Sequence, residues 1–393
     1  MRIGVMMRAA AERGGVGVFT VNVVRELLRI GTDHQWLLFY PKAGDLGGFA
    51  GLSHVREILI KGRSKLLWDQ VQVPLACRRE RVDVLYHSKF TVPLLSPCPS
   101  IMTLHGTGWF TSPFFGKLDV AYIRAFLPLY LRKSAAVASV SKLTTEFYTS
   151  RYKLPIGKVR TTYFGPAPNF VRVRDEDQLS LVRTRYALPD RYVLYLTKYR
   201  DAERKNIRGT LEAFRRVASH TDHDLVIGGT DVERFREEYN VPSDGWGKRV
   251  HFVGWIDQAD LPSVYSLATV FFYPSWMEAH PIPITEALKC ETPVVTSNRN
   301  GLQELAGDAA LLVDPDDPAS MAEGLERVLA DENLRNDLRE RGIARSPVFS
   351  WERCGRETLE LIISAGRDAR RGPDAPMREI GLPTDSPRHS GSR

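Results

Sequence analysis

Residues 268–288 read ATVFFYPSWMEAHPIPITEAL, and they carry the clearest indication of the fold class. The apolar run from Ala268 to Tyr273 is typical of a strand that is buried on both faces of a parallel sheet. Pro274 ends the strand. Pro283 suits the first turn of a helix, where its missing N–H would have had no partner. The stretch therefore predicts a strand, a loop and a helix, which together form one unit of an α/β domain.

Two glutamates lie in this unit, Glu278 in the predicted loop and Glu286 about one turn into the helix. The loop follows the carboxyl end of a strand, where open α/β sheets bind ligands. The helix N-terminus carries unpaired N–H groups and partial positive charge, which suits a phosphate. Carboxylates beside such a place can accept hydrogen bonds from sugar and ribose hydroxyls. The alternative is that both are solvated surface acids, the usual case for an isolated glutamate.

The segment resembles the E-x7-E region of the retaining family 4 glycosyltransferases, the glycosyl transferases group 1. The likeness continues through residues 290–298, CETPVVTSN, and 307–315, GDAALLVDP. The family has the GT-B fold, an α/β fold with two doubly wound, Rossmann-like domains that face a central cleft. The resemblance implies that Glu278 contacts the hydroxyls of a donor sugar and that Glu286 contacts the nucleotide ribose.

The loop between the two glutamates departs from the family pattern. Ala279, His280 and Pro281 stand where many members have Gly-Phe-Gly. The resemblance implies that Ala279, His280 and Ile282 also bind the donor. Because Pro281 cannot donate a backbone hydrogen bond, we expect the contacts that select the sugar to differ from those of such members.

A second motif lies in residues 192–206, YVLYLTKYRDAERKN. The pattern predicts a strand that ends just before Lys198 and a helix that Asn206 caps, so Lys205 directly precedes a helix N-terminus. Two lysines and a helix dipole can bind a diphosphate, although a solvated basic loop is the common alternative. The family has a Gly-Arg pair and a Lys-Asn pair whose cations hold the donor phosphates. Lys205 and Asn206 match it, whereas Lys198 replaces the usual arginine.

Glycines follow the first predicted strand, residues 2–7, and precede a helix predicted at 19–30. A glycine turn at this point lets the backbone approach a ligand. The dinucleotide fingerprint G-x-G-x-x-G fails, because Thr20 stands where the third glycine belongs, and this disfavours an NAD site. The resemblance implies that Gly15 and Gly17 lie in a loop facing the cleft and bind the donor. The alternative is a plain tight turn.

His105 follows a strand predicted at 100–104, at the ligand edge of the sheet. The resemblance implies a histidine in the cleft near the transferring sugar, and the alternative is a structural histidine. Gly254 and Trp255 belong to another predicted strand and turn, 250–256. In the family the backbone of this region lies against the nucleotide base, so both are expected to bind the donor.

Strands and helices alternate through both halves of the chain, which predicts two doubly wound domains, residues 1–168 and 169–349. The resemblance implies that the first binds the acceptor and the second the nucleotide sugar. It also implies that a final helix, within residues 350–365, crosses back to the first domain. Residues 366–393 are rich in Gly, Pro, Ser and Arg, and we predict a disordered tail.

Composition narrows the class of protein. The chain has 393 residues, of which 43% are hydrophobic and 26% charged, as in ordinary soluble proteins. The four cysteines show neither metal nor disulfide spacing, which favours reduced thiols in the cytoplasm. We recognise no signal-peptide layout and no apolar run of transmembrane length.

The net charge of +7 suits anionic partners such as a nucleoside diphosphate or an acidic membrane, and no nucleic-acid motif is present. A basic group in the first domain suggests peripheral contact with the inner membrane face, and hence a lipid-linked acceptor. A solvated surface is the alternative. The group consists of Lys61, Arg63, Lys65, Arg78, Arg79 and Arg81.

The resemblance implies retaining transfer of a hexose, with mannose the first expectation, from a GDP- or UDP-sugar to a glycan or lipid-linked acceptor in cell-surface polysaccharide synthesis. Lys198 and Lys205 would neutralise the departing diphosphate, Glu278 would orient the sugar and His105 would line the reacting face. We expect no cofactor and no metal, because the lysines supply the charge. Two alternatives stay open: a GT-B epimerase or phosphorylase, and a non-catalytic nucleotide-sugar-binding assembly subunit.

Overall fold

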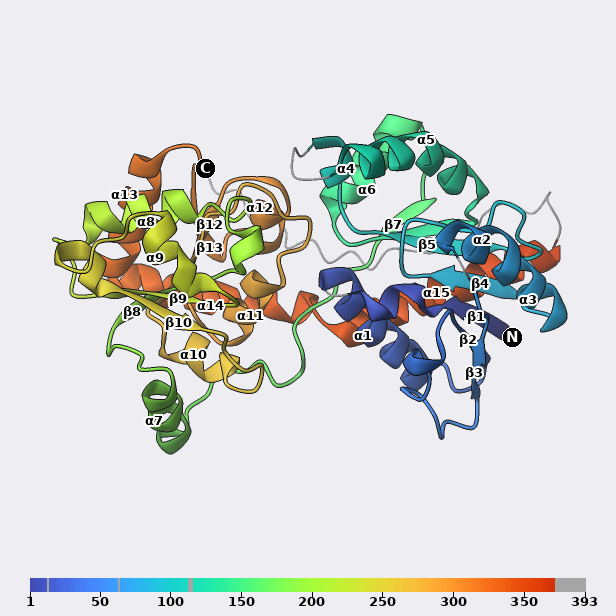
Figure 1. The fold of residues 1–393 in the computed structure, drawn as a ribbon, viewed down its shortest axis with the longest axis horizontal. Helices are drawn as coiled ribbons and strands as arrows, with labels where there is room; N and C mark the ends of the chain where they lie inside the picture. Colours follow the sequence, from blue (N-terminus) through green and yellow to red (C-terminus); the bar gives the residue numbers. More distant parts are fainter. Residues whose placement is uncertain (13, 63, 112–115, 372–393) are drawn as a thin grey trace, which may run out of the picture.

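The computed structural model describes residues 1–12, 14–62, 64–111 and 116–371, and within them two parallel sheets form two α/β domains (Figure 1). The N-terminal sheet has the order β3-β2-β1-β4-β5-β6-β7. Its strands are β1 (Arg2–Met6), β2 (Gln35–Tyr40), β3 (Val55–Leu59), β4 (Val84–His87), β5 (Ser100–Leu104), β6 (Ala136–Ser139) and β7 (Val159–Thr161). The direction of chain progression reverses between β1 and β4, so this sheet has a topological switch point there.

Helices cover both faces of the N-terminal sheet. On one face, Ile3 and Val5 of β1 pack in a core with α1, and on the other Met6 packs with Trp68 and Val73. This alternation explains why the strands are apolar throughout. The helices of this domain are α1 (Gly15–Ile30), α2 (Lys65–Leu67), α3 (Val73–Arg79), α4 (Gly108–Thr111), α5 (Lys117–Lys133) and α6 (Lys142–Tyr152).

The C-terminal sheet has the order β10-β9-β8-β11-β12-β13, and its switch point lies between β8 and β11. Its strands are β8 (Tyr192–Leu196), β9 (Asp224–Gly228), β10 (Val250–Gly254), β11 (Val270–Tyr273), β12 (Val294–Ser297) and β13 (Ala310–Val313). Its helices are α7 (Glu176–Arg185), α8 (Ile207–Val217), α9 (Phe235–Glu238), α10 (Leu261–Leu267), α11 (Ile282–Lys289), α12 (Asn300–Ala306), α13 (Pro318–Ala330) and α14 (Glu332–Arg345).

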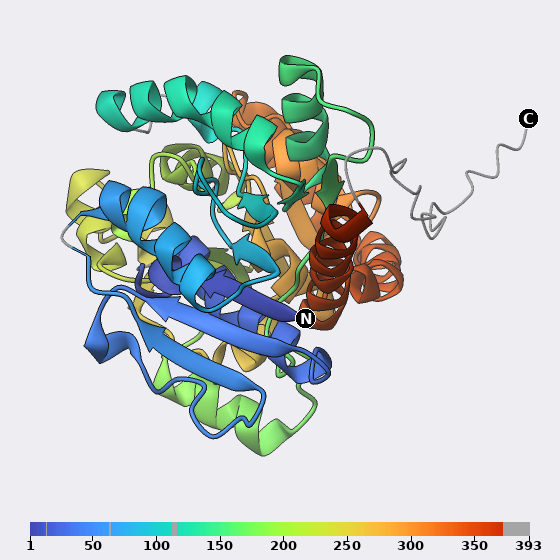
Figure 2. The same cartoon turned by 90° about the vertical axis from the view of Figure 1, so that its right-hand side faces the viewer.

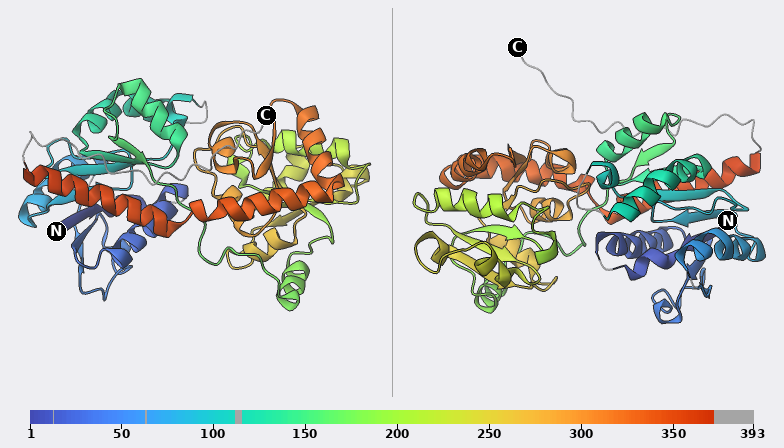
Figure 3. Two further views of the ribbon diagram at one scale, coloured as in Figure 1. Left: turned by 180° about the vertical axis from the view of Figure 1, so that it is seen from behind. Right: turned by 45° about the horizontal axis from the view of Figure 1, so that its top comes forward.

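The last helix, α15 (Trp351–Arg371), packs on the N-terminal domain, and Figure 3 shows it in red on the back of the molecule. In Figure 2 the dark red end of α15 lies beside the N-terminal strands. The helix is longer than predicted. Ala365 is buried, and a Cβ on Gly366 would meet the side chain of Met1, so packing against the first strand continues past residue 365. The tail prediction is therefore wrong up to Arg371, and residues 372–393 lie outside the described part.

Two predicted boundaries in the N-terminal domain also differ. α1 begins at Gly15 rather than at residue 19, because the residues after β1 already coil into a 3-10 turn, η1 (Met7–Ala11). The helix predicted between residues 66 and 79 contains one π turn, η3 (Trp68–Gln72), immediately before Pro74. A π turn widens the helix locally, and it places Asp69 inside the domain.

No helix in the described part of the chain is long and apolar enough to cross a bilayer.

Candidate functional site

The two domains meet at the carboxyl ends of β5 and β11. A Cβ on Gly106, which has φ +125°, would lie 2.5 Å from the Cβ of Ala279. On its other side, the loop after β11 rests on α12, where the N–H of Gly301 donates to the carbonyl of Glu278 at 3.0 Å. The glycines at positions 106 and 301 thus let the loop that carries Glu278 fit between the N-terminal domain and α12.

His280, which we expected to bind the donor, instead joins the two domains through its ring nitrogens. Its Nδ1 lies 2.8 Å from the carbonyl of Val140 and its Nε2 lies 2.7 Å from that of Phe164. The ring also stacks on Phe164 at 3.8 Å, which in turn stacks on Trp351. Ala279 and Ile282 likewise pack against the N-terminal core. These three residues therefore set the domain interface, although Ile282 also begins α11, where a backbone N–H has no intrahelical acceptor.

Glu278 is held by a cation that the sequence analysis missed. Arg204 approaches Glu278 Oε1 at 2.6 Å and donates to the carbonyl of Met277 at 2.8 Å. The hydroxyl of Tyr273 donates to the same Oε1 at 2.9 Å. Burial would lower the pKa of Arg204, but the carboxylate of Glu278 outweighs it and the pKa is raised. The second oxygen of Glu278 is then well placed to accept a ligand hydroxyl.

Lys205 interacts electrostatically with both glutamates. Burial lowers its pKa, Glu278 opposes that effect, and Lys205 in turn lowers the pKa of Glu286. Its Nζ lies 5.4 Å from the ring centre of Tyr273. Lys198 is close enough to depress the pKa of Lys205. Within the described ranges neither lysine has a carboxylate at ion-pair distance, so their charges are available to an anion.

The hydrogen bonds of Asn206 fix the position of the Lys-Asn pair. Its Oδ1 accepts the N–H of Gly209 and caps α8, as predicted. Its amide nitrogen also donates to the carbonyls of Pro274 and Pro315, so it ties the ends of β11 and β13 to α8. The backbone at Asn206 is left-handed, with φ 64°, a conformation that asparagine tolerates better than most residues. This arrangement places Lys205 beside the β11 loop.

Glu286 is buried in α11, where the hydroxyl of Tyr265 donates to its Oε2 at 2.8 Å. Burial raises the pKa of Glu286 to about 7, against the opposing effects of Tyr265 and Lys205. The carboxyl is therefore close to half ionised at neutral pH. A hydroxylated ligand that donates to it would favour the ionised form.

His105 lies at the end of β5 with its ring edge against Phe19. Its Nε2 is 2.6 Å from the carbonyl of Ser88, and since a carbonyl only accepts, Nε2 carries the proton. Burial lowers the pKa of His105 to about 4, so the ring is neutral and Nδ1 is an acceptor. A sugar hydroxyl could therefore donate a hydrogen bond to Nδ1 of His105.

The remaining predicted donor residues lie in α1 and at the end of β10. Gly15 has open space around it, whereas a Cβ on Gly17 would lie 2.0 Å from the carbonyl oxygen of Glu12. Gly17 thus serves packing within α1 and η1, rather than the glycine turn that was predicted. Gly254 has φ +68° at the end of β10, and the side chain of Trp255 beside it is 60% exposed. Both lie at the edge of the sheet that carries Lys198.

Among the residues that the structure describes, no group of three or more His, Cys, Asp or Glu side chains could hold a metal ion.

Comparisons with known proteins identify the family. The model of the family "Glycosyl transferases group 1" matches residues 182–345, and that of "Glycosyltransferase Family 4" matches residues 13–166. The first match contains the cluster of Lys198, Arg204, Lys205, Glu278 and Glu286. The chain belongs to the group 1 glycosyltransferases with the GT-B fold, and it is a sugar-transferring enzyme.

Individual relatives cover nearly the whole chain. The O-antigen chain mannosyltransferase B of Escherichia coli is 26% identical over 88% of this chain and 94% of its own. Among solved structures, sucrose-phosphate synthase from Thermosynechococcus elongatus has a TM-score of 0.69 at 22% identity, over 92% of this chain and 98% of its own. Anabaena Alr3699/HepE in complex with UDP and glucose has a TM-score of 0.69 at 16% identity, over 93% of this chain and 100% of its own.

Proposed function

We propose that this enzyme transfers mannose, with retention of anomeric configuration, from a GDP- or UDP-linked donor to a sugar hydroxyl of a growing cell-surface polysaccharide. The observation that carries the proposal is the cluster of Arg204, Lys205, Glu278 and Glu286 at the C-terminal switch point, opposite His105. Mannose and polysaccharide assembly are supported by the E. coli mannosyltransferase, which matches almost end to end. The UDP and glucose complex of HepE supports a nucleoside diphosphate sugar as the class of donor.

The chain's own residues suggest how transfer would proceed. Lys198 and Lys205 would neutralise the diphosphate as its bond to the anomeric carbon breaks, which is stabilisation of developing charge by fixed cations. Glu278 would hold the sugar hydroxyls, because Arg204 and Tyr273 fix its other oxygen. Glu286 would accept hydrogen bonds from the ribose hydroxyls of the nucleotide. Retention would follow if the acceptor hydroxyl attacks from the face that the diphosphate leaves, with a phosphate oxygen taking the proton.

Transfer and stereochemistry can be measured together. The purified protein would be given GDP-mannose or UDP-glucose with methyl α-D-mannopyranoside, and the product followed by proton NMR. The proposal predicts an α-linked disaccharide from the α-linked mannose donor, formed together with free GDP. A β-linked product would contradict retention, and preference for UDP-glucose would contradict mannose. Turnover that requires inorganic phosphate would indicate a phosphorylase, and binding without turnover would indicate an assembly subunit.

We further propose that the enzyme reaches a lipid-linked acceptor through a surface on α2, η3 and α3. Leu67, Val71 and Leu75 are spaced four residues apart and are 52%, 46% and 59% exposed. Exposed basic residues lie at both ends of this apolar row: Lys61, Lys65, Arg78, Arg79 and Arg81. Arg63 lies outside the described residues. Apolar side chains flanked by cations suit an anionic lipid surface.

Vesicle flotation tests this surface. The full chain should float with vesicles that contain one third anionic phosphatidylglycerol, and much less with neutral phosphatidylcholine vesicles. Leu67→Ser with Leu75→Ser should abolish flotation without changing transfer to a soluble acceptor. A wild-type chain that does not float with anionic vesicles would contradict the proposal.

A further inference from the structure

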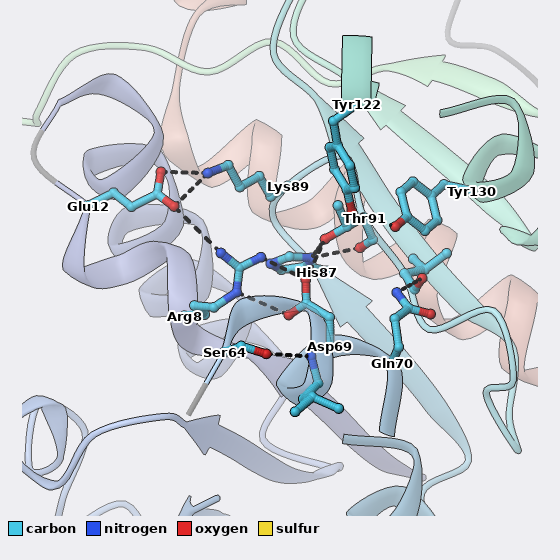
Figure 4. Close-up of polar contacts among 12 residues, drawn as sticks. Arg8, Glu12, Ser64, Asp69, Gln70, His87, Lys89, Thr91, Tyr122 and Tyr130 are labelled. Atoms are coloured by element: carbon cyan, nitrogen blue, oxygen red, sulfur yellow. Dashed lines mark hydrogen bonds and ion pairs between the residues drawn. The ribbon is translucent and has the colours of Figure 1, made fainter. Parts of the chain in front are cut away.

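The N-terminal sheet has its own switch point, between β1 and β4, and the donor cluster does not use it. In open α/β sheets this is the place where ligands bind. Charged side chains gather there from segments far apart in sequence, and Figure 4 shows them directed toward one another. Arg8 and Glu12 follow β1, Lys89 follows β4, and Asp69 comes from the π turn.

The cluster consists of two ion pairs. Lys89 Nζ lies 2.5 and 2.7 Å from the two carboxylate oxygens of Glu12. Arg8 makes a bidentate pair with Asp69, at 3.0 and 2.8 Å, and its remaining nitrogen is 3.9 Å from Glu12. The hydroxyl of Thr91 also donates to Asp69 at 3.1 Å. Asp69 is thus the anchor of the cluster, while Glu12 and Lys89 form its more accessible end, with side chains 33% and 16% exposed.

The accessible end of the cluster lies near His105, at the interface between the two domains. Ser88, whose carbonyl binds His105, directly precedes Lys89 in the chain. The charges of Lys89 and Glu12 also influence the pKa of His105. Gly106, the next residue, contacts the loop that carries Glu278. A molecule held by Glu12 and Lys89 would therefore lie next to the sugar that Glu278 is proposed to hold.

The charges indicate what kind of molecule fits. Each cation already faces a carboxylate, so the cluster is neutral as a whole. A phosphate would have to displace Glu12 from Lys89 and would be repelled by its carboxylate. A saccharide hydroxyl both donates and accepts hydrogen bonds, so it can bind to Glu12 and Lys89 while their ion pair stays intact. Phe90 lies under Lys89 and against Trp109, and such aromatic faces suit sugar C–H groups.

We infer that Glu12 and Lys89 form the acceptor subsite and that it takes a neutral, hydroxyl-rich saccharide rather than a phosphorylated one. Arg8 and Asp69 are positioning residues that hold Glu12 in place. The inference rests on the proposed function and deepens it, because it names the class of acceptor and the residues that bind it.

The test measures saccharide binding separately from transfer. Saturation-transfer NMR would follow methyl α-D-mannopyranoside, and separately mannose 6-phosphate, on the full chain with GDP present. The neutral sugar should bind to the wild type and lose at least tenfold in affinity in Glu12→Gln and in Lys89→Met. GDP affinity should stay unchanged in both variants, which also shows that they are folded. Asp337→Asn, which breaks an exposed ion pair with Arg341, is the matched control.

The outcomes separate the two proposals. Failure of the neutral sugar to bind, equal binding in both variants, or tighter binding of mannose 6-phosphate would overturn the subsite. Saccharide binding that is lost in the variants, in a chain that transfers no sugar from any donor, would leave the subsite standing and refute the proposed transfer. In an active enzyme, the same variants should raise the acceptor KM.

Discussion

Arg204 binds both the carboxylate of Glu278 and the backbone of the same loop, so one guanidinium orients the group proposed to hold the donor sugar. Its own backbone carbonyl accepts from Trp276 and Ser275, which ties the loop a second time. A guanidinium suits this place because it stays charged when partly buried and presents several donors in a plane.

Replacement of Arg204 should impair chemistry more than folding. We expect Arg204→Met to lower kcat/KM by about 10²-fold, because Glu278 would lose the donor that fixes its orientation. Steady-state kinetics with a fixed acceptor would show this. Arg200→Met, an exposed arginine in the same segment, should behave like the wild type. Activity within about twofold of the wild type in Arg204→Met would contradict the role.

The ionisation of Glu286 predicts how donor affinity depends on pH. Its pKa of about 7 means that the carboxylate, which accepts ribose hydroxyls best, forms as the pH rises from 6 to 8. Donor affinity should therefore increase over this range in the wild type and stay flat in Glu286→Gln, whose amide does not titrate. Calorimetric titration of the donor at pH 6, 7 and 8 would measure both. Equal pH dependence in the two proteins would show that Glu286 does not govern binding.

At the scale of elements, α12 and α6 join the domains. Glu304 of α12 accepts the N–H groups of Lys142 and Leu143 at the start of α6, at 2.6 and 2.9 Å. It also accepts the hydroxyl of Tyr163 at 2.7 Å. Ser141 caps the same helix by accepting the N–H of Thr144. An acid from the C-terminal domain thus completes a helix cap in the N-terminal one.

Removal of Glu304 should loosen the domains. Glu304→Ala should cost about 1–2 kcal/mol of interdomain stability, because two N–H groups and a helix dipole lose their partner. Small-angle scattering should then show a larger radius of gyration in solution. Glu323→Ala removes an exposed acid of α13 and serves as the control. An unchanged scattering profile in Glu304→Ala would mean that this contact does not hold the domains together.

Helices and strands could largely be predicted from sequence, because apolar periodicity and capping are local. The βα unit around Glu278 and the cap at Asn206 are examples. The length of α15 depends on contacts with distant residues, such as Gly366 against Met1, and could not be predicted. The same holds for Arg204, whose partner lies 74 positions away, and for Lys89 and Glu12, separated by 77. No local pattern marks such pairs.

For the molecule as a whole, buried histidines make stability depend on pH. Burial lowers the pKa of His87, His105 and His280 to about 4. The unfolded chain binds these protons near pH 6.5, so between pH 6.5 and 4 it holds more protons than the native state. Stability should therefore be complete above pH 6.5 and should fall as the pH drops toward 4.

His87 gives the cleanest test, because it is fully buried in the N-terminal domain. It should contribute about 1.4 kcal/mol per pH unit to the loss of stability in this window. Urea unfolding at pH 7, 6 and 5 should show a shallower pH dependence in His87→Gln than in the wild type. His220→Gln, at an exposed position, should keep the wild-type dependence. Parallel curves for all three proteins would refute the assignment.

We propose that the C-terminal switch point binds a nucleoside diphosphate sugar through Lys205 and Glu286. Calorimetric titration of GDP-mannose and UDP-glucose into the wild type, Lys205→Ala, Glu286→Ala and Lys289→Ala measures this most directly. We predict that one donor binds to the wild type and to Lys289→Ala, and that its affinity falls at least tenfold in the other two variants. Binding of neither donor, or equal binding in all four proteins, would contradict the claim.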